Sequence, residues 1–236
     1  MFRPLLITVW LLACSLGCRS PERMAVLVPD GSPTFELMNF KEPPSLDPIS
    51  DGWHHRTFRR HPPMDISFLT KDGYAAIRLS THDSASMLFR WVDVPLDQYP
   101  WLSWNWFIEQ TIVSEKDETT VAGDDHPARI YLTFESESGD DHSMEIIWGN
   151  RVLRRGDWKH LKFFGIFPFP HYVANGGEEN AGRWHFEQVD LRQLYATIWG
   201  DAKGARLIEI ALFCDTDETG MSSIAYFSDI QVTTGR

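Results

Sequence analysis

Apolar and polar residues alternate in short segments along most of this chain. In residues 101–109 (WLSWNWFIE), Trp104, Trp106 and Ile108 share one face, and the residues between them share the other. Because successive side chains of a β-strand point to opposite faces, this alternation predicts strands with one buried face. Segments of similar character are GYAAIRLS (73–80), ASMLFRWVDV (85–94), ARIYLTFES (128–136), SMEIIWG (143–149), DWKHLKFFGI (157–166), RWHFEQVD (183–190), ARLIEIALFCD (205–215) and SIAYFSDIQVT (223–233), with a further short strand near residues 52–60.

One segment has helical instead of strand spacing. The apolar residues Leu191, Leu194, Tyr195 and Ile198 recur one, three or four positions apart, and Gly200 is expected to end the helix. With about nine or ten strands and no alternation of strands and helices, the pattern predicts an all-β fold, an antiparallel β-sandwich with one short helix.

The chain divides into a leader, a tether and one domain. Residues 41–236 are predicted to form a single β-sandwich domain, because the longest loops, 111–127 and 167–182, are too short for a second one. Residues 19–40 are expected to hold a polar tether and the first strand. The loop from Pro168 to Gly182 is expected either to line a groove or to form a mobile hairpin tip.

The first eighteen residues are typical of a signal peptide. An apolar run of nine residues, Leu5 to Ala13, is too short to span a bilayer, and a small residue precedes each of Cys14 and Cys18. This arrangement resembles a bacterial lipoprotein signal, in which one of these cysteines is lipidated; a plain secretory signal is the alternative. We expect an exported protein anchored in a membrane, at the outer membrane or the periplasmic face, by more than one acyl chain.

Composition narrows the class of partner. The chain has 22 Lys and Arg against 33 Asp and Glu, which gives a formal net charge of −11, and no dense basic run. This balance argues against nucleic acid or an anionic membrane surface as a partner. Cys214 is the only cysteine outside the leader and lies in an apolar strand, which indicates a buried thiol and not a zinc ligand.

Two acidic segments are candidates for chemistry. Asp124 and Asp125 precede Arg129 at a strand entry, where they can coordinate a hard cation through oxygen or pair with the arginine. Asp215 and Asp217 stand in a segment, DTDETG, that looks like half of a calcium loop. The metal hypothesis takes Asp215 and Asp217 with the later Asp229 as calcium ligands. The alternatives are a β-turn with solvated acids, or a lock between Arg129 and an aspartate of another strand.

Tryptophans supply a third candidate site. Trp104, Trp106 and Trp148 lie in β segments, and Trp158, Trp184 and Trp199 lie further along. Flat rings on a sandwich face can stack on the apolar faces of sugars, so the first three are the candidates for saccharide binding. The alternative, that they belong to the core, is the stronger one for tryptophans at strand spacing.

Several segments, in this order, resemble one bacterial family. They are WLSWNW (101–106), AGDDHPARIYLTF (122–134), IIWG (146–149), GRWHFEQVDLRQLYATIWG (182–200), FCDTDETG (213–220) and AYFSDI (225–230). The chain is similar to the family named domain of unknown function 3047, whose most specific marks are the Asp-Asp with Arg and the Asp-Thr-Asp. The resemblance implies an exported domain shaped like galactose-binding, jelly-roll carbohydrate modules, without an established activity. Residues 150–155 and 187–190 depart from the family pattern.

Three functions remain open at this stage. The leading hypothesis is a cell-envelope lipoprotein whose sandwich binds a carbohydrate, with Trp104, Trp106, Trp148 and the acidic segments at the site and calcium as a possible cofactor. The second is a polysaccharide-active enzyme with Asp124 or Asp125 as acid or base and Arg129 as charge stabiliser. The third is a structural envelope lipoprotein without a small-molecule ligand. No GxSxG, P-loop, GxGxxG or HExxH motif favours another enzyme class.

Overall fold

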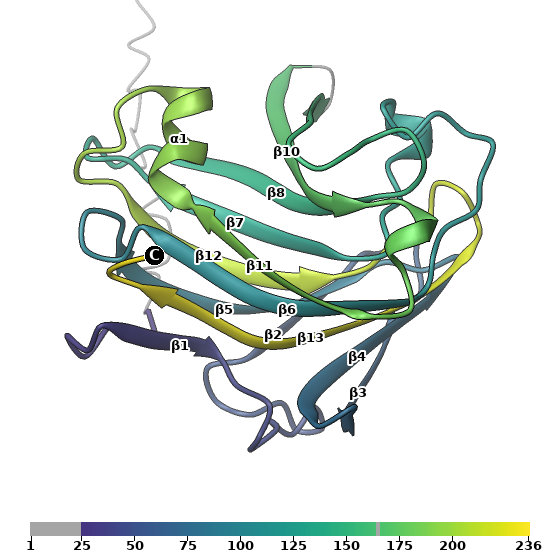
Figure 1. Cartoon of the computed structure of the whole chain (residues 1–236), viewed down its shortest axis with the longest axis horizontal. Helices are drawn as coiled ribbons and strands as arrows, with labels where there is room; N and C mark the ends of the chain where they lie inside the picture. The colour runs from purple at the N-terminus through teal and green to yellow at the C-terminus, as the bar shows by residue number, and fades with distance from the viewer. Residues whose placement is uncertain (1–24, 164–165) are drawn as a thin grey trace, which may run out of the picture.

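The computed structural model describes residues 25–163 and 166–236 and folds into two β-sheets packed face to face (Figure 1). The first sheet has six strands in the order β11-β6-β13-β4-β3, and β1 pairs with β13. Its strands are β1 (Thr34–Met38), β3 (Asp65–Lys71), β4 (Tyr74–His82), β6 (Trp101–Gln110), β11 (Trp184–Asp190) and β13 (Ser222–Thr233). The strand expected within residues 19–40 is therefore part of the sandwich.

The second sheet has seven strands in the order β2-β5-β12-β7-β8-β10-β9. They are β2 (His54–Thr57), β5 (Ser86–Pro95), β7 (Arg129–Glu135), β8 (Asp141–Gly149), β9 (Trp158–Phe163), β10 (Phe167–Gly176) and β12 (Arg206–Phe213). All strand pairs are antiparallel except β8 with β10. The predicted fold class, an antiparallel jelly-roll-like β-sandwich with one short helix, is thus confirmed, with a single parallel pair added.

The inward faces of both sheets form one apolar core. Trp104, Trp106 and Ile108 of β6 share one face, as the alternation predicts, and this face points into the core. Trp104, Trp106 and Trp148 are fully buried and contact one another edge to face, at centroid distances of 5.3 Å and 5.5 Å along the series. Contrary to the expectation that they stack on a saccharide, these three rings offer no face to solvent. They form the centre of the core, because their side chains lie on the inward faces of β6 and β8.

The segment after β9 is a strand where a loop was expected. Phe167–Gly176 forms β10, so the predicted loop from Pro168 to Gly182 is wrong over most of its length. Pro168 and Pro170 pair with β9, and the ladder with β8 begins only at His171. A proline has no N–H to donate to a ladder. Pro168 and Pro170 are tolerated because no second strand pairs with β10 at these two positions.

The single helix closes one end of the sandwich. Helix α1 (Leu191–Trp199) follows β11 directly, and it buries Leu191, Leu194 and Tyr195 against the core. Asp190 caps its first turn, since its carboxylate accepts a hydrogen bond from the Gln193 amide. Gly200 ends it with a φ of 93°, a conformation that glycine adopts at no steric cost. The predicted helix is confirmed at both ends.

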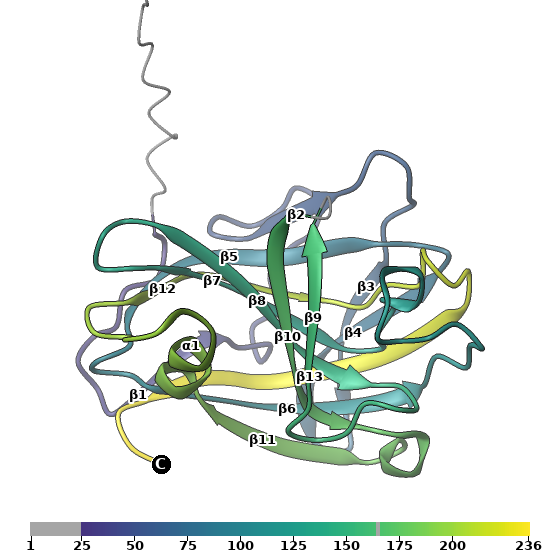
Figure 2. The same ribbon diagram turned by 90° about the horizontal axis from the view of Figure 1, so that it is seen from above.

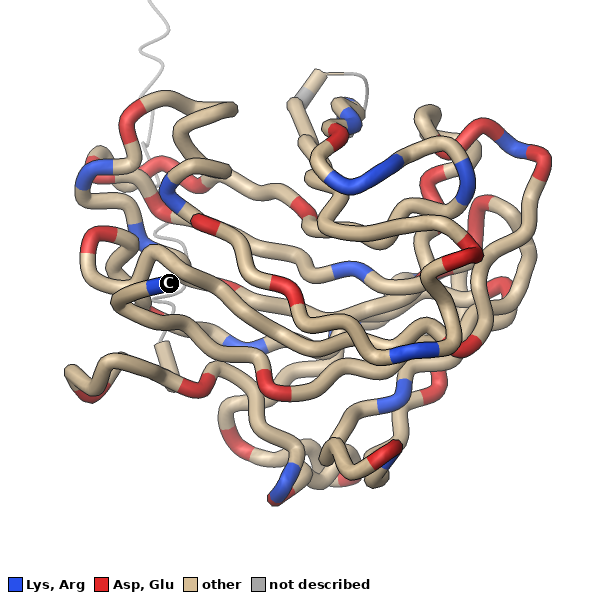
Figure 3. Tube along the Cα trace, viewed as in Figure 1, with Lys and Arg blue, Asp and Glu red and all other residues tan. Residues whose placement is uncertain are grey.

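Charged positions are spread over the trace, with acidic and basic residues interspersed (Figure 3). No helix of the described residues is long and apolar enough to cross a membrane. Cys14 and Cys18 lie outside the described residues, so the lipidation hypothesis stays a prediction. Cys214 is fully buried as a free thiol, as expected, and burial raises its pKa.

Candidate functional site

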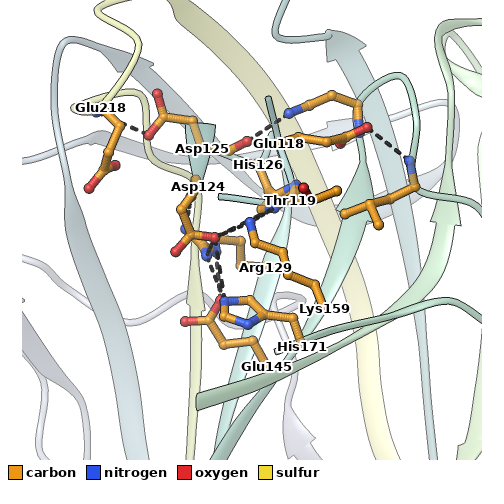
Figure 4. Close-up of polar contacts among 12 residues, drawn as sticks. Glu118, Thr119, Asp124, Asp125, His126, Arg129, Glu145, Lys159, His171 and Glu218 are labelled. Atoms are coloured by element: carbon orange, nitrogen blue, oxygen red, sulfur yellow. Dashed lines mark hydrogen bonds and ion pairs between the residues drawn. The ribbon is translucent and has the colours of Figure 1, made fainter. Parts of the chain in front are cut away.

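A buried arginine organises the acidic segments that the sequence singled out (Figure 4). Arg129 opens β7 on the side opposite Ile130 and the core, and its side chain is almost fully buried. Its Nε donates to Glu145 Oε2 at 2.7 Å, and its Nη2 lies 3.1 Å from Asp124 Oδ1. Its Nη1 pairs with Asp215. One guanidinium thus ties three carboxylates from three separate parts of the chain, which is the lock across strands offered as one alternative above.

Lysine and histidine side chains complete this arginine cluster. Lys159 forms an ion pair with Asp124, and its Nζ lies 3.1 Å from His126 Nε2. His126 Nδ1 lies 3.0 Å from the carbonyl oxygen of Trp148, so Nδ1 donates there and Nε2 accepts from the lysine. Burial, reinforced by Lys159 and Arg129, lowers the pKa of His126 well below its usual value, so this imidazole is neutral.

The second histidine is held in the same way. His171 Nδ1 lies 3.0 Å from the carbonyl oxygen of Phe169, which leaves Nε2 to accept from Arg129 Nη2 at 3.1 Å. Although burial opposes it, the positive charges of Arg129 and Lys159 lower the pKa of Asp124. Asp124 is the most exposed carboxylate of the cluster and keeps 18% of its side chain accessible. Oδ1 of Asp124 already forms ion pairs with Arg129 and Lys159, which favours a structural role for Asp124 over that of a general acid.

A second acidic group lies beside the arginine cluster. Asp125, Asp215, Asp217 and Glu218 have carboxylate oxygens that all lie within 4.8 Å of one another, so these four residues are called the carboxylate group below. Asp125 is fully buried, and it accepts from the backbone amides of Glu218 at 3.2 Å and Thr219 at 2.6 Å. Asp229 does not belong to this group: it lies on β13 of the other sheet, where it accepts from Asn105 at 3.3 Å. The prediction that Asp229 joins Asp215 and Asp217 at a metal site is therefore wrong, while Asp215 and Asp217 do lie together.

The carboxylate group retains a proton at neutral pH. Burial, the hydrogen bond with Asp125 and the charge of Asp215 raise the pKa of Glu218 to about 9. Burial also raises the pKa of Asp217. The proton on Glu218 relieves part of the repulsion among these carboxylates, as a calcium ion would do through its own charge.

We expect stability to fall as pH rises through the window set by Glu218. The folded state keeps the proton up to about pH 9, whereas the unfolded chain releases it near 4.5. The stabilisation is therefore complete below 4.5 and is lost as pH rises toward 9. Glu218→Gln mimics the protonated carboxyl group, so its free energy of unfolding is expected to depend less on pH and to exceed that of the wild type at the alkaline end. Urea unfolding at both ends of the window measures this.

Two controls make this test specific. Glu178→Gln changes an exposed glutamate outside the group and is expected to leave the pH dependence unchanged. Added calcium shows whether a proton or a metal ion neutralises the carboxylate group. If calcium raises the melting temperature of the wild type in alkaline buffer but not that of Glu218→Gln, calcium is favoured as the native occupant. Identical pH slopes for Glu218→Gln and the wild type contradict the raised pKa.

The loop before β7 is held by a contact that sequence reasoning missed. The Glu118 carboxylate is buried and accepts from four consecutive backbone amides, those of Asn150 at 2.6 Å, Arg151 at 2.9 Å, Val152, and Leu153 at 2.9 Å. Successive amides turned toward one point form a nest, a backbone arrangement that binds anions. Asn150 also donates to the carbonyl oxygen of Asp125, so the nest and the carboxylate group are connected.

A second missed contact joins the two sheets. Arg155 forms a two-pronged ion pair with the buried Glu187 of β11, at 2.7 Å and 2.8 Å, and Asn175 of β10 donates to the same carboxylate. Glu118 binds the amides of residues 150–153, and Glu187 lies within residues 187–190, so each of these two glutamates involves a segment that departs from the family pattern. No local motif marks them, because their partners are distant in sequence.

An aromatic groove lies between α1 and the β9–β10 pair. It has a volume of about 380 Å³. Trp158 and Tyr172 face each other across this pair with ring centroids 5.2 Å apart, and Trp101 lies at the far side beside Arg236. The side-chain amides of Gln188 and Gln193 line the groove without a hydrogen-bond partner among the described residues. The groove thus combines the partly exposed rings of Trp158 and Tyr172 with side-chain amides that are free to bind a ligand. The buried tryptophans of the core offer neither.

Solved structures with a similar β-sandwich fold include carbohydrate-active proteins. An endoglucanase from Rhodothermus marinus is 8% identical with a TM-score of 0.45, covering 77% of this chain and 91% of that one. A xyloglucanase domain from Sinorhizobium fredii, in complex with cellobiose, is 11% identical with a TM-score of 0.43, covering 79% and 95%. A family 30 carbohydrate-binding module from Clostridium thermocellum is 10% identical with a TM-score of 0.36, covering 76% and 86%.

Family membership rests on the sequence itself. No curated protein matches this chain. The segments that hold Asp124, Asp125, Arg129 and Asp215 are the marks on which the resemblance was based, and they form the arginine cluster and the carboxylate group. Residues 51–231 match the model described as "Protein of unknown function (DUF3047)", and the chain belongs to that family.

Proposed function

We propose that this protein is a membrane-anchored binding protein of the cell envelope that takes a saccharide in the groove between α1 and the β9–β10 pair. The observation that carries the proposal is the meeting of the partly exposed Trp158 and Tyr172 rings with the unbonded amides of Gln188 and Gln193. Sugars have apolar C–H faces and hydroxyl edges, and they need both kinds of contact.

The tryptophans keep the role that the sequence suggested, but different ones take it. Trp158 and Trp101 line the groove and are the stacking candidates. Trp104, Trp106 and Trp148 are buried in the core and cannot contact a ligand. The anchor is the part of the proposal that rests on sequence alone, through Cys14 or Cys18.

Binding is favoured over catalysis by the state of the acidic residues. An acid–base pair must present a carboxyl group to its substrate. Asp125 is fully buried and spends both oxygens on backbone amides, while Asp124 is paired with Arg129 and Lys159. These contacts support a role in holding the strands and loops that carry the groove.

The proposal predicts a loss of affinity in Trp158→Ala. Titration of the full chain with soluble oligosaccharides of glucose, xylose, mannose and N-acetylglucosamine, followed by calorimetry, is expected to give binding for at least one series. Removal of the Trp158 ring is expected to weaken that binding by about tenfold or more, the equivalent of about 1.4 kcal/mol.

The matched control is Trp199→Ala, which removes a partly exposed ring of α1 that packs on His142 and does not line the groove. Its affinity is expected to equal that of the wild type below the melting temperatures of both variants. Absence of heat with all four series, or equal losses in the two variants, counts against the proposed function.

A further inference from the structure

The outer face of the first sheet carries a second set of aromatic rings, away from the core. Phe107 of β6 and Tyr226 of β13 form its buried floor, and Trp184 of β11 packs on them. The Tyr74 ring lies 4.6 Å from the Trp184 ring, between centroids. Phe186 stands beside them with 63% of its surface exposed. We call these five residues the outer aromatic patch.

Charges around the outer aromatic patch balance, with Lys71 and Arg78 against Glu109 and Asp229. Lys71 Nζ lies 4.1 Å from the Phe107 ring centre and 3.5 Å from Glu109 Oε2, while the Tyr226 hydroxyl donates to the same carboxylate at 2.7 Å. Asn105, which pairs with Phe186 across β6 and β11, bonds to Asp229 at 3.3 Å. A neutral apolar centre with a polar rim fits an uncharged amphipathic ligand better than an acidic or basic one.

The patch continues into the groove along one strand. Trp184, Phe186 and Gln188 alternate with the inward residues of β11 and so share one side of it. Gln188 lines the groove, and Phe186 lies two residues earlier, about 7 Å away along the strand. Figure 2 shows β11 running along one edge of the molecule toward α1, beside the β9–β10 pair.

We propose that the site extends from the groove over Phe186 to the outer aromatic patch, so that its ligand is an extended, uncharged saccharide chain of several units and not a mono- or disaccharide. This inference rests on the proposed function and names its substrate class. Each aromatic ring along β11 offers one stacking surface, and a chain long enough to pass Gln188 reaches the next. Affinity then grows with chain length until the patch is covered.

The test compares short and long probes. Oligosaccharides of two and six units from the glucose, xylose, mannose and N-acetylglucosamine series are titrated into the full chain. For the series that binds, the six-unit chain is expected to bind about tenfold more tightly than the two-unit chain. Phe186→Ser is expected to remove this advantage and to leave the affinity for two units unchanged. Phe58→Ser is the matched control, because Phe58 is an exposed phenylalanine outside the groove and the patch.

Each other outcome has one meaning. Equal affinities for two and six units, or an undiminished advantage in Phe186→Ser, overturn the extended site and leave the proposed function standing. No binding of any probe overturns both. If Phe186→Ser instead turns a dimer into a monomer in analytical ultracentrifugation, the patch is an interface between copies of this chain, and the inference is wrong.

Discussion

Replacement of Arg129 by methionine is expected to lower the free energy of unfolding by about 3–5 kcal/mol. The variant keeps most of the side-chain volume but leaves Asp124, Glu145 and Asp215 without their shared cation. Lys159 still faces Asp124, but the direct ion pairs of Glu145 and Asp215 with the guanidinium are lost. Since a domain of this kind is stable by only about 5–15 kcal/mol, the loss is a large part of the total.

Urea unfolding of the full chain measures the effect, and Arg206→Met supplies the matched control. Arg206 pairs with Asp93 at the surface, where both side chains are 36% exposed, and such a pair contributes about 0–1 kcal/mol. Arg129→Lys keeps a charge but not the planar fork, so an intermediate loss is expected. Equal stability of Arg129→Met and Arg206→Met contradicts the assignment of Arg129 as the residue that holds the strands together.

The fold was accessible from sequence wherever one face of a strand is buried. Alternation identified β6 and β7 and the residues that share each face, because period two is a local property. It did not say that Trp104 and Trp106 lie on the core side, since an aromatic row is equally compatible with a binding face. The strand β10 was missed because Pro168 and Pro170 argue against a ladder, and only the absence of a second partner at those positions permits them.

The site was accessible in part for the same reason. Asp124 and Arg129 are five residues apart, and Asp215 follows a strong strand, so their pairing was a reasonable alternative from sequence. Glu145 comes from the neighbouring strand β8, and Lys159 and His171 come from β9 and β10. Only the order of the strands in the sheet brings these residues together, and the sequence does not give that order. The groove depends on where α1 lies relative to β9, which no local pattern encodes.

Replacement of Glu118 by alanine is expected to lower the free energy of unfolding by about 3 kcal/mol, because hydrogen bonds to a charged group contribute about 1.5–3 kcal/mol each and some of the freed amides regain water. Four backbone amides of residues 150–153 lose their acceptor at once. Hydrogen exchange at these amides is expected to speed up, and urea unfolding gives the stability change. The loop also packs closely elsewhere: a side-chain carbon at Gly123 would come within 2.4 Å of the Asp117 carbonyl oxygen.

Glu115→Ala is the matched control for this change, since Glu115 lies in the same loop, is 94% exposed, and meets Arg151 only at 3.6 Å. Its stability and amide exchange are expected to stay close to those of the wild type. Glu118→Gln retains one carbonyl oxygen for the three amides that Oε1 accepts, but turns a donor toward Asn150, so its loss is expected to fall between the two. If exchange at residues 150–153 is unaltered in Glu118→Ala, those amides have another acceptor, and Glu118 does not fix the loop beside the carboxylate group.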